Sequence, residues 1–194
     1  DFGGGVSFAS NRIIHGGLRY LQSMDLTRFR ESVGERRWFL QNMPDLIEPM
    51  TCVMPLSGRG LKCAPVMRIA LTLNDFLSRK RNAGVAEHRH LPKARVEKAS
   101  VYENVLSPIG VASDRPCAVW HDARMVNAQR VMMELSRWAV VSGATLRNYT
   151  EVTGLTTESG SVKGVVARDV ETGVALAFDA PVVINAAGPA CAGY

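Results

Sequence analysis

The residues most able to do chemistry lie near the N-terminus, in the string Ile14-His15-Gly16-Gly17-Leu18-Arg19-Tyr20. The planar guanidinium of Arg19 is either a solvated surface group or a group that binds a phosphate or carboxylate through two parallel hydrogen bonds. Gly16 and Gly17 lack side chains, so they either serve a tight turn or let the backbone lie against a ligand. His15 is either a satisfied core histidine or a ring that faces the same ligand. The string is therefore the first candidate for a binding site.

Other segments carry weaker signals. The run Val182-Val183-Ile184-Asn185-Ala186-Ala187-Gly188-Pro189 is what a buried strand needs when it meets a ligand or a helix at its carboxyl end. Asp122 is interpreted as a helix cap rather than a catalytic acid. His88 and His90 would face one side of a strand, but with no third ligand nearby a metal site is not expected. Arg79-Lys80-Arg81 is interpreted as the end of a helix, with lipid contact as the alternative.

Periodicity and capping signals predict the elements that must position these residues. The glycine-rich start predicts an irregular loop that leads into a short helix. Longer helices are expected over residues 26–42, capped by Asp25 or Thr27, over 66–77, and from Asp122 to a stop at Gly143. Strands are expected over 51–55, 145–153, 161–169, 174–179 and 182–186, and residues 82–118 are expected to be irregular.

Composition and charge restrict the class of protein. Apolar residues make up 46% of the 194 residues and charged residues 21%, which is the balance of a folded globular protein. The four cysteines show no CxxC spacing, so neither a zinc site nor a dense disulfide framework is indicated. Residues 1–100 carry a net charge of +7 and residues 101–194 one of −2. The basic half could meet nucleic acid, anionic lipid or a phosphorylated small molecule.

Two strings and their order resemble the FAD-dependent glycerol-3-phosphate dehydrogenases, which are D-amino-acid-oxidase-like flavoenzymes. The first is the string from Ile14 to Leu21, and the second is the Val182–Pro189 run, with Ala187 where the family usually has Thr. His121-Asp122-Ala123-Arg124-Met125 is similar to the start of a helix in that family. The resemblance covers nearly the whole chain. The family's GxGxxG unit is not found before Asp1, so we expect an internal fragment of such an enzyme.

The resemblance implies roles for individual residues. It places Arg19 and Tyr20 on the substrate. It places His15, Gly16 and Gly17 beside the flavin, which we expect to be bound non-covalently. The other residues that it places at the cofactor are Ser10 and Arg12 in the preceding loop, Val152 in a strand near the adenine, and Ala187 and Gly188. The resemblance identifies no catalytic base in this chain.

The expected fold class is α/β, a fragment of a two-domain FAD-dependent oxidoreductase with a Rossmann-like FAD-binding fold and part of the substrate domain. The expected parts are a flavin loop and helix over 1–50, a portion of the substrate domain over 51–118, and a helix, a three-strand meander and a final strand of the FAD domain over 119–194.

The activity implied by the resemblance is oxidation of sn-glycerol 3-phosphate to dihydroxyacetone phosphate, with FAD as cofactor and a quinone as electron acceptor. The implied location is cytoplasmic, with peripheral contact at the inner membrane as one option. A related flavin enzyme that acts on another 2-hydroxy acid or an amine is one alternative. A non-catalytic basic binding module is another, but Trp38, Trp120 and Trp138 lie in apolar patterns rather than among the basic residues, which argues against nucleic acid.

Overall fold

The computed structural model describes residues 2–188 and divides into two compact units. The larger unit spans Gly3–Met133, and the smaller unit consists of Phe2 and the residues from Glu134 onward. The helix α5 (Ala128–Val141) contains the boundary between them. Among the described residues, no helix is both long and apolar enough to cross a bilayer.

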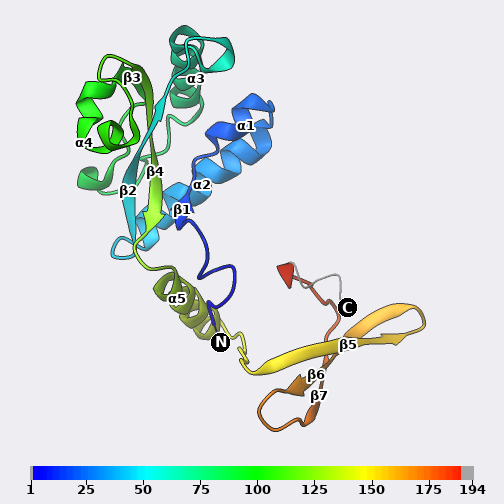
Figure 1. Ribbon diagram of the computed structural model, residues 1–194. Helices are drawn as coiled ribbons and strands as arrows, with labels where there is room; N and C mark the ends of the chain where they lie inside the picture. The colour runs from blue at the N-terminus through cyan, green and yellow to red at the C-terminus, as the bar shows by residue number, and fades with distance from the viewer. Residues whose placement is uncertain (1, 189–194) are drawn as a thin grey trace. The chain divides into compact units, whose positions relative to one another are not determined.

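A four-stranded antiparallel sheet organises the larger unit (Figure 1). Its central strand is β4 (Pro116–Met125), which pairs along one side with β2 (Ile47–Pro55). On its other side β4 pairs with β1 (Ile13–Ile14) near its end and with β3 (Arg95–Lys98) near its start. Two prolines lie in β2, where they are tolerated because β2 is an edge strand.

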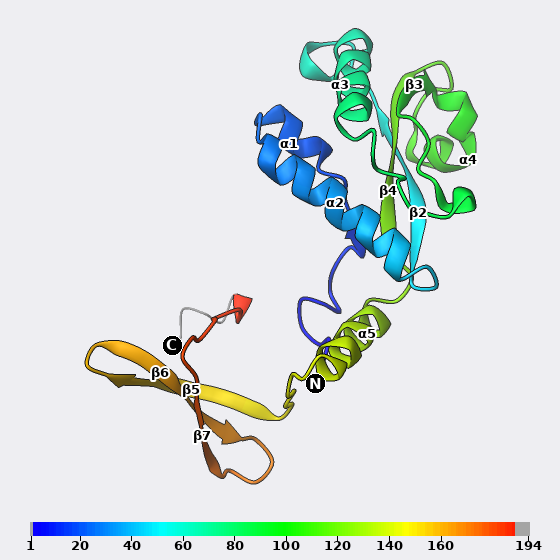
Figure 2. The same cartoon turned by 180° about the vertical axis from the view of Figure 1, so that it is seen from behind.

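Helices cover both faces of this sheet (Figures 1 and 2). They are α1 (Leu18–Gln22), α2 (Leu26–Asn42), α3 (Ala64–Leu77) and α4 (Glu103–Leu106). Because successive residues of a strand point to opposite faces, Ala118 packs with α3 residues and Cys117 packs with Leu106 of α4. Short 3-10 helices lie at Gly60–Lys62, Glu87–Arg89, Ala99–Tyr102 and Ser107–Ile109.

The smaller unit contains an antiparallel meander of β5 (Thr150–Glu158), β6 (Ser161–Asp169) and β7 (Ala175–Asp179). The turn between β5 and β6 has positive φ at both Ser159 and Gly160. The meander predicted from the sequence is confirmed, although its first strand begins at Thr150 rather than 145. The helix stop at Gly143, where φ is +94°, is confirmed as well.

Three sequence predictions about the fold are wrong. Asp122 does not begin a helix, because it lies in β4, paired with Met50. The helix α5 begins six residues later, at Ala128. The Asn127 side chain accepts a hydrogen bond from the Arg130 N–H at 3.0 Å at the start of this helix. The segment 182–186 is not a strand, because no described strand pairs with its backbone; Ile184 is 85% exposed. Pro189 lies outside the described residues. Residues 82–118 are not wholly irregular, since they include β3 and short helices.

Candidate functional site

The string singled out in the sequence forms a sharp connection between β1 and α1. The strand β1 is held on β4, with Ile14 opposite Ala123. Gly17 then adopts a left-handed conformation with φ +76° and caps α1, and its carbonyl accepts a hydrogen bond from the Tyr20 N–H at 2.8 Å. Few residues other than glycine adopt this conformation without strain. The turn therefore determines where α1 begins, and with it the position of the Arg19 backbone.

This turn borders a cavity of about 770 Å³ within the larger unit. One wall is formed by the turn and α1, a second by α3 with Leu61, and a third by β2 and β4. The lining is mostly aliphatic and aromatic, and its two charged side chains are Arg19 and Asp122. An apolar cavity of this size with a few polar groups is typical of a small-molecule site. Its lining includes His15, Gly17, Leu18, Arg19, Tyr20, Met54, Val66, Met67, Ala70, Leu73, Trp120 and Asp122.

Four of the predicted site residues meet at this cavity: His15, Gly17, Arg19 and Tyr20. The rings of His15 and Tyr20 make an edge contact, with centroids 5.9 Å apart and planes at 63°. Arg19 is exposed and Tyr20 is half-buried. An exposed guanidinium at the rim of an apolar cavity is free to bind an anionic group of a ligand held inside.

Gly16 is explained by contacts within the protein. It is buried, and a Cβ atom at this position would overlap the guanidinium of Arg36. Gly17 is also buried and close to α2, because a Cβ atom there would lie 3.1 Å from the Ser32 Cβ. Tight packing thus accounts for both glycines. Gly17, unlike Gly16, also lines the cavity.

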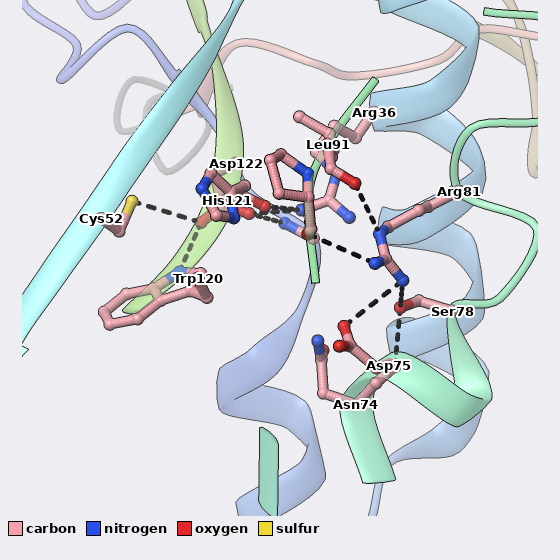
Figure 3. Close-up of polar contacts among 12 residues, drawn as sticks. Arg36, Cys52, Asn74, Asp75, Ser78, Arg81, Leu91, Trp120, His121 and Asp122 are labelled. Atoms are coloured by element: carbon pink, nitrogen blue, oxygen red, sulfur yellow. Dashed lines mark hydrogen bonds and ion pairs between the residues drawn. The ribbon is translucent and has the colours of Figure 1, made fainter. Parts of the chain in front are cut away.

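A polar cluster around the buried residues Arg36 and Asp122, which we call the Asp122 cluster, is shown in Figure 3. It consists of Asp122, Arg36 of α2, Trp120 and Cys52. Arg36 and Asp122 form an ion pair of 2.5 Å, with side chains that are 5% and 9% exposed. Burial raises the pKa of the Cys52 thiol to about 11, and the nearby Asp122 carboxylate acts in the same direction. Burial also lowers the pKa of Arg36, which Asp122 partly offsets.

Sequence reasoning missed Arg36 and Trp120 as site residues and misinterpreted Asp122. A signal for Arg36 was present, because the buried face of α2 reads Phe29, Ser32, Arg36 and Leu40 at helical spacing. A charged residue on such a stripe requires a buried partner. Its partner is 86 positions further along the chain, and no local pattern reveals that distance.

The preceding loop contains Ser10 and Arg12, both exposed and neither lining the cavity. The Ser10 hydroxyl donates to the Ser7 carbonyl and accepts from the Arg12 N–H, each at 3.3 Å. Arg12 has φ +58°, and its carbonyl accepts a hydrogen bond from the Met125 N–H at 2.8 Å. The loop is therefore tied to the end of β4, and the cofactor contacts assigned to these two residues stay predictions.

The other predicted cofactor residues lie in the smaller unit. Val152 is half-buried in β5, opposite Ala167 of β6. Ala187 and Gly188 are exposed, and the Ala187 N–H donates to the Asn185 side chain at 3.0 Å. The roles assigned to them also stay predictions.

The basic run at the end of α3 is less uniform than the sequence indicated. Arg79 and Lys80 are exposed. Arg81 is buried, pairs with Asp75 at 3.3 Å, and donates to the carbonyls of Leu91 and Pro92. The interpretation of this run as a helix end is confirmed, because α3 ends at Leu77 with Ser78 as its C-cap. Arg81 in addition connects the end of the helix to the segment that contains Leu91 and Pro92.

Comparisons with known proteins agree with this architecture. The FAD dependent oxidoreductase (DAO) family matches residues 1–193. The chain is 31% identical over 199 residues to the mitochondrial glycerol-3-phosphate dehydrogenase of Saccharomyces cerevisiae, covering 97% of this chain and 29% of that protein. It is 27% identical over 192 residues to the glycerol-3-phosphate dehydrogenase of a Synechocystis species, covering 97% of this chain and 33% of that protein. The chain thus spans about a third of the length of the curated relatives it matches.

A solved structure shares the fold. The glycerol-3-phosphate dehydrogenase of Bacillus halodurans, complexed with FAD, superimposes with a TM-score of 0.54 at 19% identity. The match covers 93% of this chain and 26% of that one. The α/β class expected from the sequence, and its resemblance to FAD-dependent enzymes, are confirmed.

Proposed function

Because the chain belongs to the FAD dependent oxidoreductase family, we propose that it forms the substrate-facing part of an FAD-dependent glycerol-3-phosphate dehydrogenase. The observation that carries this proposal is the position of Arg19, a guanidinium at the rim of an apolar cavity that Gly17 also lines. A phosphate ester requires a cationic group for its phosphate, which Arg19 supplies, and the apolar lining suits a planar ring.

The residues that line the cavity fit the ring end of FAD. Gly17 presents no side chain to the cavity, and Leu18, Met54 and Trp120 supply apolar walls on which a planar ring can lie. In this proposal His15 and Gly17, which line the cavity, hold the ring. The resemblance assigns Gly16 to the flavin as well, and Ser10, Arg12, Val152, Ala187 and Gly188 to the cofactor. FAD, when bound, accepts the two electrons released by the substrate.

The chain's own residues bind and orient the substrate. Arg19 binds the phosphate through paired N–H···O bonds, and the Tyr20 hydroxyl supplies a further polar contact. The aliphatic residues of α3 form an apolar wall of the cavity, and an apolar environment strengthens an ionic contact. Asp122 is not proposed as the base, because both of its carboxylate oxygens are already bonded to protein donors.

The electron acceptor in this proposal is a quinone, and the location is cytoplasmic with peripheral contact at the inner membrane. The resemblance supports both assignments.

The experiment uses the full-length protein that carries this chain. Its FAD content is measured, and reduction of a quinone analogue is followed with sn-glycerol 3-phosphate, glycerol, a 2-hydroxy acid or an amine as donor. We expect reduction with sn-glycerol 3-phosphate and little with glycerol, which lacks the phosphate. Preference for the 2-hydroxy acid or the amine would reassign Arg19 to a carboxylate. A protein that holds no FAD but shifts nucleic acid in a gel would overturn the enzymatic proposal.

A further inference from the structure

The carboxylate of Asp122 connects three elements of the larger unit (Figure 3). Its Oδ1 accepts hydrogen bonds from the Gly16 N–H at 2.6 Å and from Arg36 Nη1 at 2.5 Å. Its Oδ2 accepts a hydrogen bond from the Trp120 indole N–H at 3.0 Å. The same Arg36 nitrogen donates to the His121 carbonyl at 2.8 Å. The turn, α2 and β4 are therefore joined at one buried group.

The bond from Gly16 to Asp122 holds the turn at the point where the chain leaves the sheet. The residue before Gly16 lies just beyond the short β1, and the residue after it caps α1 without any side-chain hydrogen bond. Hydrogen bonds to a charged acceptor are the stronger kind, and this one is shielded from water. A shift of the Gly16 backbone would move the start of α1, and with it the backbone of Arg19 and Tyr20.

We propose that Asp122, held in place by Arg36, is a positioning residue that sets the location of Arg19 and Tyr20 at the cavity rim through the Gly16 N–H. The proposal rests on the proposed function, in which Arg19 binds the substrate phosphate. Asp122 acts here through the backbone of the turn and not through contact with the substrate.

Two variants separate this role from a general contribution to stability. Arg36→Met keeps the acceptor for Gly16 but leaves a buried carboxylate without its cation. The double variant Arg36→Met with Asp122→Leu leaves no unpaired charge but removes the acceptor. Replacing both partners of a buried pair by apolar groups is tolerated better than removing one. We therefore expect the double variant to be the more stable of the two and the poorer at binding substrate.

The matched control is a second, largely buried ion pair in the same unit, between Arg81 and Asp75. Arg81 and Asp75 are 10% and 17% exposed and make no contact with the turn. Arg81→Met with Asp75→Leu should change the thermal midpoint while leaving the KM for sn-glycerol 3-phosphate within about twofold of wild type.

The measurements are made on the full-length protein with FAD bound. KM and kcat per bound FAD are determined, together with the Kd of sn-glycerol 3-phosphate by calorimetry and the thermal midpoint. In the Arg36→Met, Asp122→Leu variant we expect KM and Kd to rise about tenfold to a hundredfold, since small misplacements of a binding group are costly. We expect a smaller rise in Arg36→Met, despite its lower thermal midpoint. If KM follows stability across the variants, Asp122 is only structural and the proposal is wrong.

Hydrogen exchange of the peptide that covers residues 13–22 tests the positioning without any substrate. We expect faster exchange in the Arg36→Met, Asp122→Leu variant than in Arg36→Met. Equal exchange in the two variants would overturn the positioning role, whatever the substrate is. Failure of wild-type protein to bind or oxidise sn-glycerol 3-phosphate, with the exchange difference present, would instead overturn the proposed function.

Discussion

Substitution of Gly16 by alanine should be among the most destabilising single changes in the larger unit. The new Cβ atom would overlap the Arg36 guanidinium, so Arg36 would have to leave its bond with Asp122. Breaking a buried ion pair in this way costs about 3–5 kcal/mol. For a unit of this size, at about 3–4 °C per kcal/mol, that corresponds to a fall of roughly 9–20 °C in the thermal midpoint.

Gly34→Ala is the matched control for this prediction. Gly34 lies within α2, and a Cβ atom at this position meets no atom within 4 Å. Alanine in a helix interior is more favourable than glycine by about 0.5–1 kcal/mol, so this variant should be slightly more stable than wild type. Circular dichroism during heating measures both midpoints.

A double-mutant cycle tests the cause of the destabilisation. In an Arg36→Met background the guanidinium is gone, so Gly16→Ala should cost less than about 1 kcal/mol more. If Gly16→Ala unfolds at the wild-type temperature, or costs the same with and without Arg36, the reasoning about this contact is refuted.

Three further predictions concern Arg19, His121 and Cys52. Arg19→Ala should lower kcat/KM for sn-glycerol 3-phosphate roughly tenfold to a hundredfold with FAD content unchanged, and Arg19→Lys should recover part of this loss. Arg30→Ala, on the exposed surface of α2, is the control and should leave kcat/KM unchanged, so equal kinetics in all three variants would make Arg19 a surface group. Burial, and then the charges of Arg95 and Arg81, lower the pKa of His121 in the folded protein, so the unfolded chain binds the proton more readily and stability should fall as the pH drops below about 6.5. Urea unfolding measured at several pH values should show a weaker dependence of the unfolding free energy on pH in His121→Gln than in wild type, and the same dependence in both proteins would contradict this. The raised pKa of Cys52, about 11, predicts slow alkylation by iodoacetamide at neutral pH, which mass spectrometry can follow. If Cys52 in the folded protein is alkylated as fast as in protein unfolded in guanidinium chloride, the thiol is not held as described.

Local features of the fold were predictable from the sequence. Asp25 or Thr27 was expected to cap the helix over residues 26–42, and Asp25 is the cap, because its side chain accepts a hydrogen bond from the Arg28 N–H at 3.1 Å. The stop at Gly143 and the turn at Ser159-Gly160 are likewise set by residues that lie next to one another in the chain. Such signals depend on a few consecutive residues and need no knowledge of the tertiary fold.

Long-range pairing was not predictable in the same way. Asp122 was assigned to a helix from the sequence because Asp is a good N-cap and a helical pattern follows it. In the structure β4 continues to Met125, because it pairs with β2, which lies about 70 residues earlier in the chain. The run 182–186 shows the opposite case, a strand-like composition without a paired strand among the described residues. Strand formation depends on a partner that the local sequence does not contain.

The candidate site was only partly visible for the same reason. The glycine pair and Arg19 stand out by type and spacing, and the structure brings Gly17 and Arg19 to one cavity. The pairing of Arg36 with Asp122 joins a helix to a distant strand, and only the structure shows it.

The central claim is that Arg19 holds the phosphate of a substrate whose electrons pass to FAD. Anaerobic mixing of the FAD-loaded full-length protein with sn-glycerol 3-phosphate, followed through the visible absorbance of the flavin, tests it most directly. The account predicts that the flavin band is bleached in wild type, and that Arg19→Ala needs roughly tenfold to a hundredfold more substrate for the same bleaching. Bleaching at equal concentrations in both proteins, or bleaching by glycerol as readily as by sn-glycerol 3-phosphate, would contradict it.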